Sequence, residues 1–414
     1  MGRRRTEVIA PARHRSAARQ GRFAAAVCLG AAAIFVPPPT YASSLLAPAV
    51  GAADNATMGT RIADPHTPAA ALFENPAGLT GFETLTNSVG LGIGYGRAQV
   101  QADVPAGYDE TNTNWPVIPD FGLSLPLDER WRFAIGSYGS TGSTFDFPAP
   151  AGSGDTSFFA ETIILAFPLG AAYRINDQLS LGAELQPLFG QLRAHFPLPG
   201  VDFPFKYKIN GPGVQGMLGM TVRPTAQWAF GLSVRTPGMI WMGGSMPVPG
   251  AGRQRVSVDL EMPTQVFLGA TWHCLPQLTL SGSVRFTNSS TLGDSTIKYA
   301  LTPMANSGFV PDANDEWKFA LAAEYAMRQQ TVARLGIGWS SHIVGAHGVS
   351  PLVFDDDDTK IAAGVGQTFG RWVLDATVGY VLPAERHVAP ALLPGAYSMQ
   401  GGMLMLEITY AADL

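Results

Sequence analysis

The chain has 414 residues, of which 14% are charged and 10% aromatic, and its formal net charge is −5. Soluble domains carry roughly 25% charged residues, and a negative chain lacks the basic surface that a nucleic acid requires. We therefore expect no nucleic-acid partner, and the 47 glycines together with the aromatics suit a β-barrel wall that faces lipid.

The N-terminus has the order of a secretory signal. Seven arginines fall within the first 22 residues, an apolar run follows over 23–36, and three prolines end it at 37–39. A basic region, an apolar region and small residues are the parts of a signal peptide, and the apolar run is too short to span a bilayer. We expect residues 1–42 to be removed before Ser43. Since Cys28 lies in that segment, the mature chain keeps one thiol, Cys274, and forms no internal disulfide.

Beyond residue 42, apolar residues alternate with small or polar ones over segments of about ten residues, and no run is long enough for a membrane helix. In 371–382, one face carries Trp372, Leu374, Ala376, Val378, Tyr380 and Leu382. The opposite face is dominated by small and polar residues, with single charges. This pattern favours a strand between lipid and a barrel lumen over a strand of a soluble sandwich, whose second face would be highly charged.

The same reading along the chain predicts about fourteen antiparallel strands in an all-β transmembrane barrel, residues 86–414. The predicted spans are 86–101, 117–127, 131–142, 159–174, 178–196, 204–223, 226–236, 253–274, 276–287, 315–327, 331–342, 357–369, 371–382 and 399–410. Short turns alternate with long connections at 143–158, 237–252, 288–314 and 383–398, as expected for periplasmic turns and outer loops.

Residues 43–85 do not alternate and are predicted to form a hatch, or plug, inside the lumen. The segment contains the turn sequence Phe73-Glu74-Asn75-Pro76-Ala77-Gly78-Leu79-Thr80. Proline fixes its own φ and disfavours the helical region for Asn75, so this is a tight turn. Further motifs follow in order: Ser233-Val234-Arg235-Thr236-Pro237, Leu260-Glu261-Met262-Pro263-Thr264, Arg334-Leu335-Gly336-Ile337-Gly338-Trp339 and Phe354-Asp355-Asp356-Asp357-Asp358.

In this order and spacing, from about residue 45 to the end, the motifs resemble the FadL family of outer-membrane transporters of long-chain fatty acids and aromatic hydrocarbons. The resemblance implies a fourteen-stranded barrel with a hatch, ligand capture in an outer apolar groove, and a lateral exit opened by hatch movement and a kink in the third strand. It assigns the hatch gate to Asn75, Pro76, Ala77 and Gly78. By strand order, it places the kink in 131–142, where Gly136, Gly139 and Gly142 allow a bend.

The predicted outer loops contain apolar side chains, which are costly on a surface unless they cover one another or bind a ligand. We expect them to form the capture groove, although packing among the loops alone is the other interpretation. The candidate residues are Phe145, Phe147, Phe158, Phe159, Met239, Ile240, Trp241, Met242, Leu392 and Leu393.

Other chemistry is weakly indicated. The acidic run 355–358 can offer oxygen ligands to Ca²⁺ but is more often a solvated loop, and His342 and His347 have no third ligand nearby in sequence. We predict no metal, no cofactor and no catalytic residues. The lumen-facing charges at Arg235, Arg285, Lys318, Glu324, Arg334 and Asp375 are expected to form bracing ion pairs rather than to guide a carboxylate.

The prediction is therefore a non-enzymatic, monomeric barrel in the outer membrane of a Gram-negative bacterium, surrounded by lipid and lipopolysaccharide, for passive uptake of a hydrophobic small molecule. Two alternatives remain open on the same fold. One is a secretion or assembly partner that binds protein through its loops, and the other is a barrel-embedded lipid hydrolase, which would need a serine–histidine pair on the outer wall.

Overall fold

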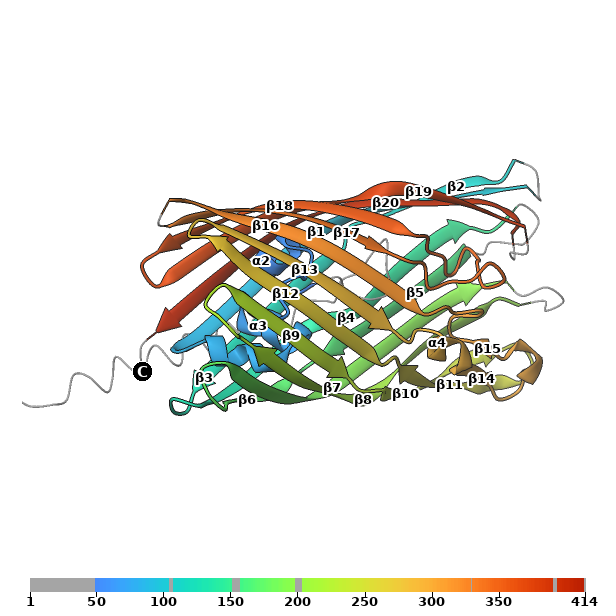
Figure 1. The fold of residues 1–414 in the computed structure, drawn as a ribbon. Coiled ribbons are helices and arrows are strands. Elements are labelled where there is room, and N and C mark those ends of the chain that lie inside the picture. Colours follow the sequence, from blue (N-terminus) through green and yellow to red (C-terminus); the bar gives the residue numbers. More distant parts are fainter. Residues whose placement is uncertain are drawn as a thin grey trace, which may run out of the picture.

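A computed structural model describes residues 49–103, 107–150, 157–197, 203–328, 330–389 and 393–412. The predicted signal peptide, 1–42, and Leu392 lie outside the described residues. The chain forms a closed antiparallel barrel of fourteen strands, with short helices inside it near the end where the chain terminates (Figure 1). Closure is made by the first and last strands, which pair along their whole length from Leu85↔Ala412 to Ala102↔Gly395.

Eighteen strand segments build the wall. They are β1 (Leu85–Ala102), β2 (Asp109–Asn114), β3 (Val117–Pro126), β4 (Trp131–Pro148), β5 (Ser157–Ala166), β6 (Leu169–Arg174), β7 (Leu179–Phe196), β8 (Phe205–Val222), β9 (Trp228–Arg235), β10 (Gly238–Val248), β11 (Gly252–Met262), β12 (Gln265–Leu275), β13 (Leu278–Thr287), β16 (Glu316–Arg328), β17 (Thr331–Ser340), β18 (Asp358–Phe369), β19 (Trp372–Val388) and β20 (Gly395–Ala412).

Four of the fourteen wall strands are interrupted at a proline, which explains the larger number of segments. The breaks lie at Pro116 (β2/β3), Pro168 (β5/β6), Pro237 (β9/β10) and Pro263 (β11/β12). Proline has no backbone N–H to give to the ladder, but its carbonyl still accepts, as Pro116 does from the N–H of Gly94 at 2.8 Å. Each interrupted pair therefore continues as one wall strand.

The alternation predicted from the sequence is confirmed on the lipid face. The predicted outward residues of 226–236 are all exposed, and those of β16 and β19 follow the same rule. Large apolar side chains exposed on the outer wall include Trp228, Phe230, Leu232, Val234, Trp317, Phe319, Leu321, Trp372, Leu374, Val378 and Tyr380. In water such a surface would aggregate, whereas in a bilayer it is solvated by acyl chains.

Several strands extend further outward than predicted, which corrects three of the long connections. The predicted connections at 143–158, 237–252 and 383–398 consist largely of the outer parts of β4, β5, β10, β11, β19 and β20. The connection at 288–314 instead folds into α4 (Thr291–Asp294), β14 (Thr296–Tyr299), η2 (Pro303–Ala305) and β15 (Ser307–Gly308). Beyond the bilayer the two faces of a strand no longer differ in solvent, so the sequence alternation that marks a strand weakens.

The residues before β1 form α2 (Ala52–Ala56), α3 (Pro68–Glu74) and η1 (Pro76–Gly81), and nearly all are buried within the barrel. Helix α3 begins where the Thr67 hydroxyl accepts the N–H of Ala70 at 3.3 Å, with proline at the first helical position. We refer to residues 49–82 as the hatch. No helix among the described residues is long and apolar enough to cross a membrane.

Glycines on the lumen face of the wall make room for the hatch. A Cβ at Gly219 of β8 would collide with the Asn75 amide, and one at Gly182 of β7 would collide with the backbone of Ala77. The side chains on the predicted lumen face are thus small because the hatch backbone approaches the wall closely at these points.

Candidate ligand path and hatch gate

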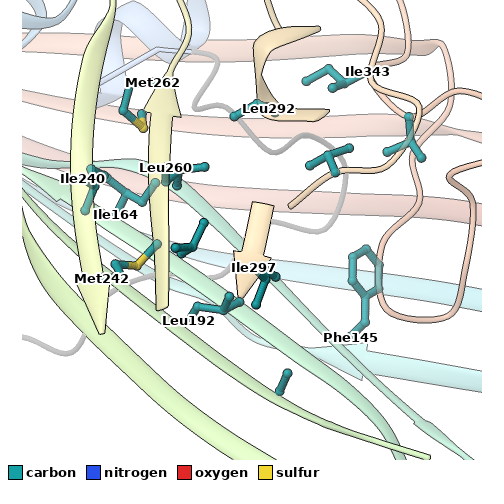
Figure 2. Close-up of a cluster of buried hydrophobic side chains, with 14 of the residues drawn as sticks. Phe145, Ile164, Leu192, Ile240, Met242, Leu260, Met262, Leu292, Ile297 and Ile343 are labelled. Carbon is teal, nitrogen blue, oxygen red and sulfur yellow. The ribbon is translucent and has the colours of Figure 1, made fainter. Parts of the chain in front are cut away.

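A continuous cluster of buried apolar side chains runs through the barrel interior from the outer loops to the hatch. At its inner end are Leu72 and Phe73 of α3, and further out it includes Ile240 and Met242 of β10. Figure 2 shows Ile240, Met242, Ile164, Leu260 and Met262 gathered in one part of this cluster, with Ile297 and Leu292 contributed by the loop over 288–315. This part of the interior is therefore filled with apolar side chains.

Most of the predicted capture residues belong to this cluster. Phe145, Phe147, Phe158, Ile240, Met242 and Leu393 are all buried in it. Phe354 lies between three of its aromatic partners, with ring centroids 4.8 Å from Phe145, 6.2 Å from Phe147 and 5.0 Å from Tyr397. These rings pack one of the outer loops, 341–357, onto the outer ends of β4 and β20, on the side that faces the lumen.

Three predicted capture residues are placed differently. Because β10 is a strand and not a loop, Met239 and Trp241 alternate with Ile240 and Met242, and Trp241 is 52% exposed on the opposite face. Phe159 likewise faces away from Phe158, and the Arg193 guanidinium lies over its ring at 5.4 Å. The alternation of a strand therefore removes these three from the interior surface.

The predicted hatch turn is fastened to the wall through Asn75. Its side-chain Nδ2 donates to the carbonyl oxygens of Ile62 at 2.8 Å and of Met220 on β8 at 3.1 Å, while its Oδ1 accepts the N–H of Ala77 at 3.1 Å. Asn75 is thus the C-cap of α3 through its backbone, and its side-chain amide caps η1 and binds the barrel. Pro76 occupies the first position of η1, and a Cβ at Gly78 would collide with the ring of Pro65. This small turn can pack only with glycine at that place.

A charged cluster joins the hatch to a second part of the wall, at β16. Nε2 of His66 is 2.8 Å from Glu324 of β16, and its Nδ1 is 3.0 Å from Asp54 of α2. Arg61 pairs with Glu324 and also with Asp64, at 2.7 Å. Burial lowers the pKa of His66, but Glu324 and Asp54 raise it more, to about 10. The imidazole is therefore a cation that bridges two carboxylates.

Ion pairs are formed by four of the six lumen charges for which bracing was predicted, while Arg235 donates instead to Gln265 and to the Phe73 carbonyl. Arg334 of β17 pairs with Glu324 and with Asp375 of β19, and Lys318 pairs with Glu316 at 3.2 Å. Arg61, Asp64 and His66 were not singled out from the sequence. The only sequence feature that could have indicated them is their charge within a hatch of mostly small and apolar residues. Charged residues are rarely buried without partners.

Phe73 of α3 is held between two arginines of the wall. The guanidinium carbons of Arg235 and Arg285 lie 4.9 Å and 5.4 Å from the centre of its ring, and both also lie over Phe267. The neighbouring hatch carboxylate, Glu74, is fully buried, and burial, followed by the charge of Asp54, raises its pKa to about 8. Cation–π contacts thus hold the hatch where its backbone enters the Asn75 turn.

Strand β4 stops pairing with its neighbour β3 near helix α3 of the hatch. Strand β3 pairs with β4 only from Pro126↔Arg132 to Asp120↔Tyr138, and in the described chain β2, further out, pairs with β1 alone. A bulge leaves Ser140 without a partner on β5, and residues 137–143 are buried on both faces. The irregularity thus lies within the predicted segment, and its centre is at Ser140, between Gly139 and Gly142. Tyr138 at this point donates from its hydroxyl to Leu72 of the hatch at 3.3 Å.

The acidic run has a local structural role. Asp355 is buried and accepts the backbone N–H groups of Ile343 at 2.7 Å and Val344 at 2.8 Å, which orders the loop 341–357. His342 pairs with Asp357 at 2.7 Å, and Asp356 lies close to both. Among the residues that the structure describes, no serine hydroxyl is hydrogen-bonded to a histidine.

The model of the outer membrane protein transport protein family (OMPP1/FadL/TodX) matches residues 48–198, which comprise the hatch and the wall through β7. No curated protein matches the chain.

Solved structures share the fold over nearly the whole chain. A FadL homologue of Pseudomonas aeruginosa superposes with a TM-score of 0.76 at 15% identity, covering 89% of this chain and 100% of that one. The toluene transporter TodX of Pseudomonas putida gives 0.71 at 15% identity, covering 90% and 100%. The toluene transporter TbuX of Ralstonia pickettii gives 0.66 at 17% identity, covering 88% and 98%. The chain is thus similar to the OMPP1/FadL/TodX family over the hatch and the first half of the wall, and it shares the fold of FadL-like barrels of the Gram-negative outer membrane.

Proposed function

We propose that the protein takes up hydrophobic compounds passively, capturing them among the apolar side chains of the outer loops and releasing them sideways through the wall when the hatch moves. The observation that carries this proposal is the continuous apolar cluster, which begins at the outer loops and ends at the hatch beside the irregular part of β4. The relatives named as toluene transporters and the family resemblance to fatty-acid transporters suggest the two compound classes to test first.

The driving force is burial of apolar ligand surface, worth about 25 cal/mol per Å². A ligand moving inward exchanges contacts with one set of apolar side chains for contacts with the next, so no step requires it to enter water. Phe145 and Ile240 are part of this surface near the outer side, and Leu72 and Phe73 close it on the hatch side.

The lateral exit is supported by the wall between β2 and β4. In the described residues the strands are joined there by side-chain bonds, from Asn114 Nδ2 to the Thr144 carbonyl at 3.1 Å and from the Tyr108 hydroxyl to the Pro148 carbonyl at 2.7 Å. Hydrogen bonds made by side chains can break without disrupting backbone hydrogen bonds between paired strands. The inner end of this seam lies at Tyr138, which contacts the hatch through Leu72 and through Phe73, at a ring distance of 5.2 Å. A hatch movement would therefore act on the seam directly.

Uptake into cells tests the proposal. Cells lacking their own transporter would be given labelled toluene or a labelled long-chain fatty acid, with and without this protein. We expect uptake of at least one compound with the wild type and an altered rate with Asn75→Ala, whereas Asn314→Ala, on an exposed loop, serves as the matched control. Absence of uptake of both compounds by cells that hold folded barrel in the outer membrane would contradict the proposal.

A cross-link tests the lateral exit separately. In a Cys274→Ser background, cysteines at Asn114 and Thr144 would be oxidised to join β2 to β4. Uptake should stop on oxidation and return on reduction, while each single cysteine variant should be insensitive to both treatments. Undiminished uptake by the fully cross-linked protein would overturn the lateral route.

A further inference from the structure

One cavity among the outer loops differs in character from the rest of the apolar interior. Its volume is about 130 Å³, and it lies between the outer parts of β4, β5, β7 and β8 and the loops over 288–315 and 341–357. Leu192 and Ile297, both seen in Figure 2, form part of its apolar lining, with Phe196 and Phe309 among its aromatic residues. We refer to it as the outer chamber.

The outer chamber contains hydroxyl groups but no charge. The described residues that line it include none of Asp, Glu, Lys, Arg or His, whereas hydroxyls come from Ser143, Thr162, Tyr207, Tyr299, Ser307 and Ser350. A carboxylate placed there would lose its hydration without gaining a cationic partner, which is strongly unfavourable. A purely apolar molecule would leave hydroxyls facing it without hydrogen bonds, which is also unfavourable.

Tyr207 and Tyr299 supply a defined hydrogen-bonding point. Their hydroxyl oxygens are 3.0 Å apart, both side chains are buried, and their rings meet edge to face with centroids 5.7 Å apart. One O–H···O bond uses only one of the two protons, so the pair retains a proton to donate and lone pairs to accept. The pair can therefore bind a hydroxyl or carbonyl oxygen while the rings contact an apolar body.

The volume sets the size of that body. A protein cavity of about 150 Å³ lined by apolar side chains holds one benzene molecule. The outer chamber is slightly smaller and has aromatic rings in its wall, whose edges and faces favour offset contact with another ring. A long acyl chain does not fit in it as a whole.

Building on the proposed function, we infer that the outer chamber binds an uncharged compound of about one ring in size that carries a hydroxyl or carbonyl group, held by the Tyr207–Tyr299 pair. The chamber then discriminates by charge and by hydrogen bonding before a compound meets the purely apolar interior. Fatty-acid anions are excluded from this chamber.

Calorimetric titration of the purified full-length protein in detergent tests the inference, with phenol, toluene and benzoate as probes of one size. The Ala194→Phe variant fills the chamber, since Ala194 lines it. Titrating each probe into this variant in the same detergent measures the heat of partition of the probe into micelles. Tyr207→Phe and Tyr299→Phe remove one hydroxyl each while keeping the ring, and Tyr325→Phe, at an exposed lipid-facing position, is the control.

We expect saturable phenol binding that Ala194→Phe abolishes and that either hydroxyl deletion weakens about fivefold, the effect of one neutral hydrogen bond. Toluene should bind more weakly than phenol and be unaffected by the hydroxyl deletions, and benzoate should give no saturable signal. Benzoate binding as tight as phenol, or phenol binding unchanged in both hydroxyl deletions, would overturn the inference. Failure here with normal hydrocarbon uptake by cells leaves the proposed function intact, whereas chamber binding without any cellular uptake contradicts the proposed function alone.

Discussion

Nε2 of His66 in the hatch and Oε2 of Glu324 on β16 of the wall are 2.8 Å apart, although 258 residues separate them in the chain. With Asp54 at 3.0 Å on the other side of the ring, this imidazole joins two carboxylates in a buried setting. The contact shows that the hatch is held by specific charges as well as by close packing.

Docking of the hatch should weaken at alkaline pH. The pKa of His66 is raised from 6.5 to about 10 by Glu324 and Asp54, against the effect of burial. A raised pKa stabilises the folded form fully below pH 6.5, and this stabilisation is lost as the pH rises through about 10. Hydrogen exchange of hatch amides, corrected for the intrinsic rate and compared with β20 in the same sample, should accelerate between pH 7 and 10. In His66→Ala this excess acceleration should vanish, and its persistence would assign the effect to another group.

Loss of the Asn75 amide should loosen the hatch and leave the barrel intact. Asn75→Ala removes bonds to Ile62 and Met220 and the cap on Ala77. Leaving these buried groups without partners should cost about 1–3 kcal/mol. Hydrogen exchange over 60–82 should increase, while heat-dependent gel migration, which reports the folded barrel, should match the wild type. Equal protection of the hatch in both proteins would show that the amide does not hold it.

Filling a wall glycine should displace the hatch. Valine at Gly219 would place methyl groups where the Asn75 amide lies, whereas a Cβ at Gly243 meets no atom within 4 Å. Gly219→Val should therefore raise the single-channel conductance in planar bilayers as the lumen opens to ions. Gly243→Val, the matched control, should conduct like the wild type, and equal conductance of all three proteins would contradict the packing account.

The aromatic contacts of Phe354 should hold the loop over 341–357. Phe354 is 3% exposed and lies against Phe145, Phe147 and Tyr397. Removing a buried phenyl ring typically costs about 3–5 kcal/mol, so Phe354→Ala should make this loop far more sensitive to limited proteolysis. The Phe369→Ala variant, changed at a side chain that is 59% exposed, should be cleaved at the wild-type rate. Similar cleavage of both variants would show that the ring cluster does not stabilise the loop.

The wall could be predicted largely from the sequence, because a membrane strand is solvated differently on its two faces and its side chains alternate accordingly. Trp317, Phe319 and Leu321 of β16 point outward as their spacing indicates. The prediction failed where this difference in solvent ends. Strand β2, with the sequence Asp-Glu-Thr-Asn-Thr-Asn, was missed because it has no apolar face. The whole of β10 was predicted as a loop, so Trp241 was assigned to the capture groove although it faces outward.

The sequence by itself determined the barrel, its fourteen wall strands and the small hatch turn at Asn75, since these depend on local periodicity and on the backbone limits of proline and glycine. Only the tertiary structure decided which residues meet inside. The partners His66 and Glu324, Phe73 and Arg235, and Tyr207 and Tyr299 lie 258, 162 and 92 residues apart. Such contacts follow from barrel closure and strand register, which local alternation does not specify. The sequence also does not show whether a small lumen-facing residue contacts water, ligand or the hatch. That depends on where the hatch backbone lies in the folded barrel.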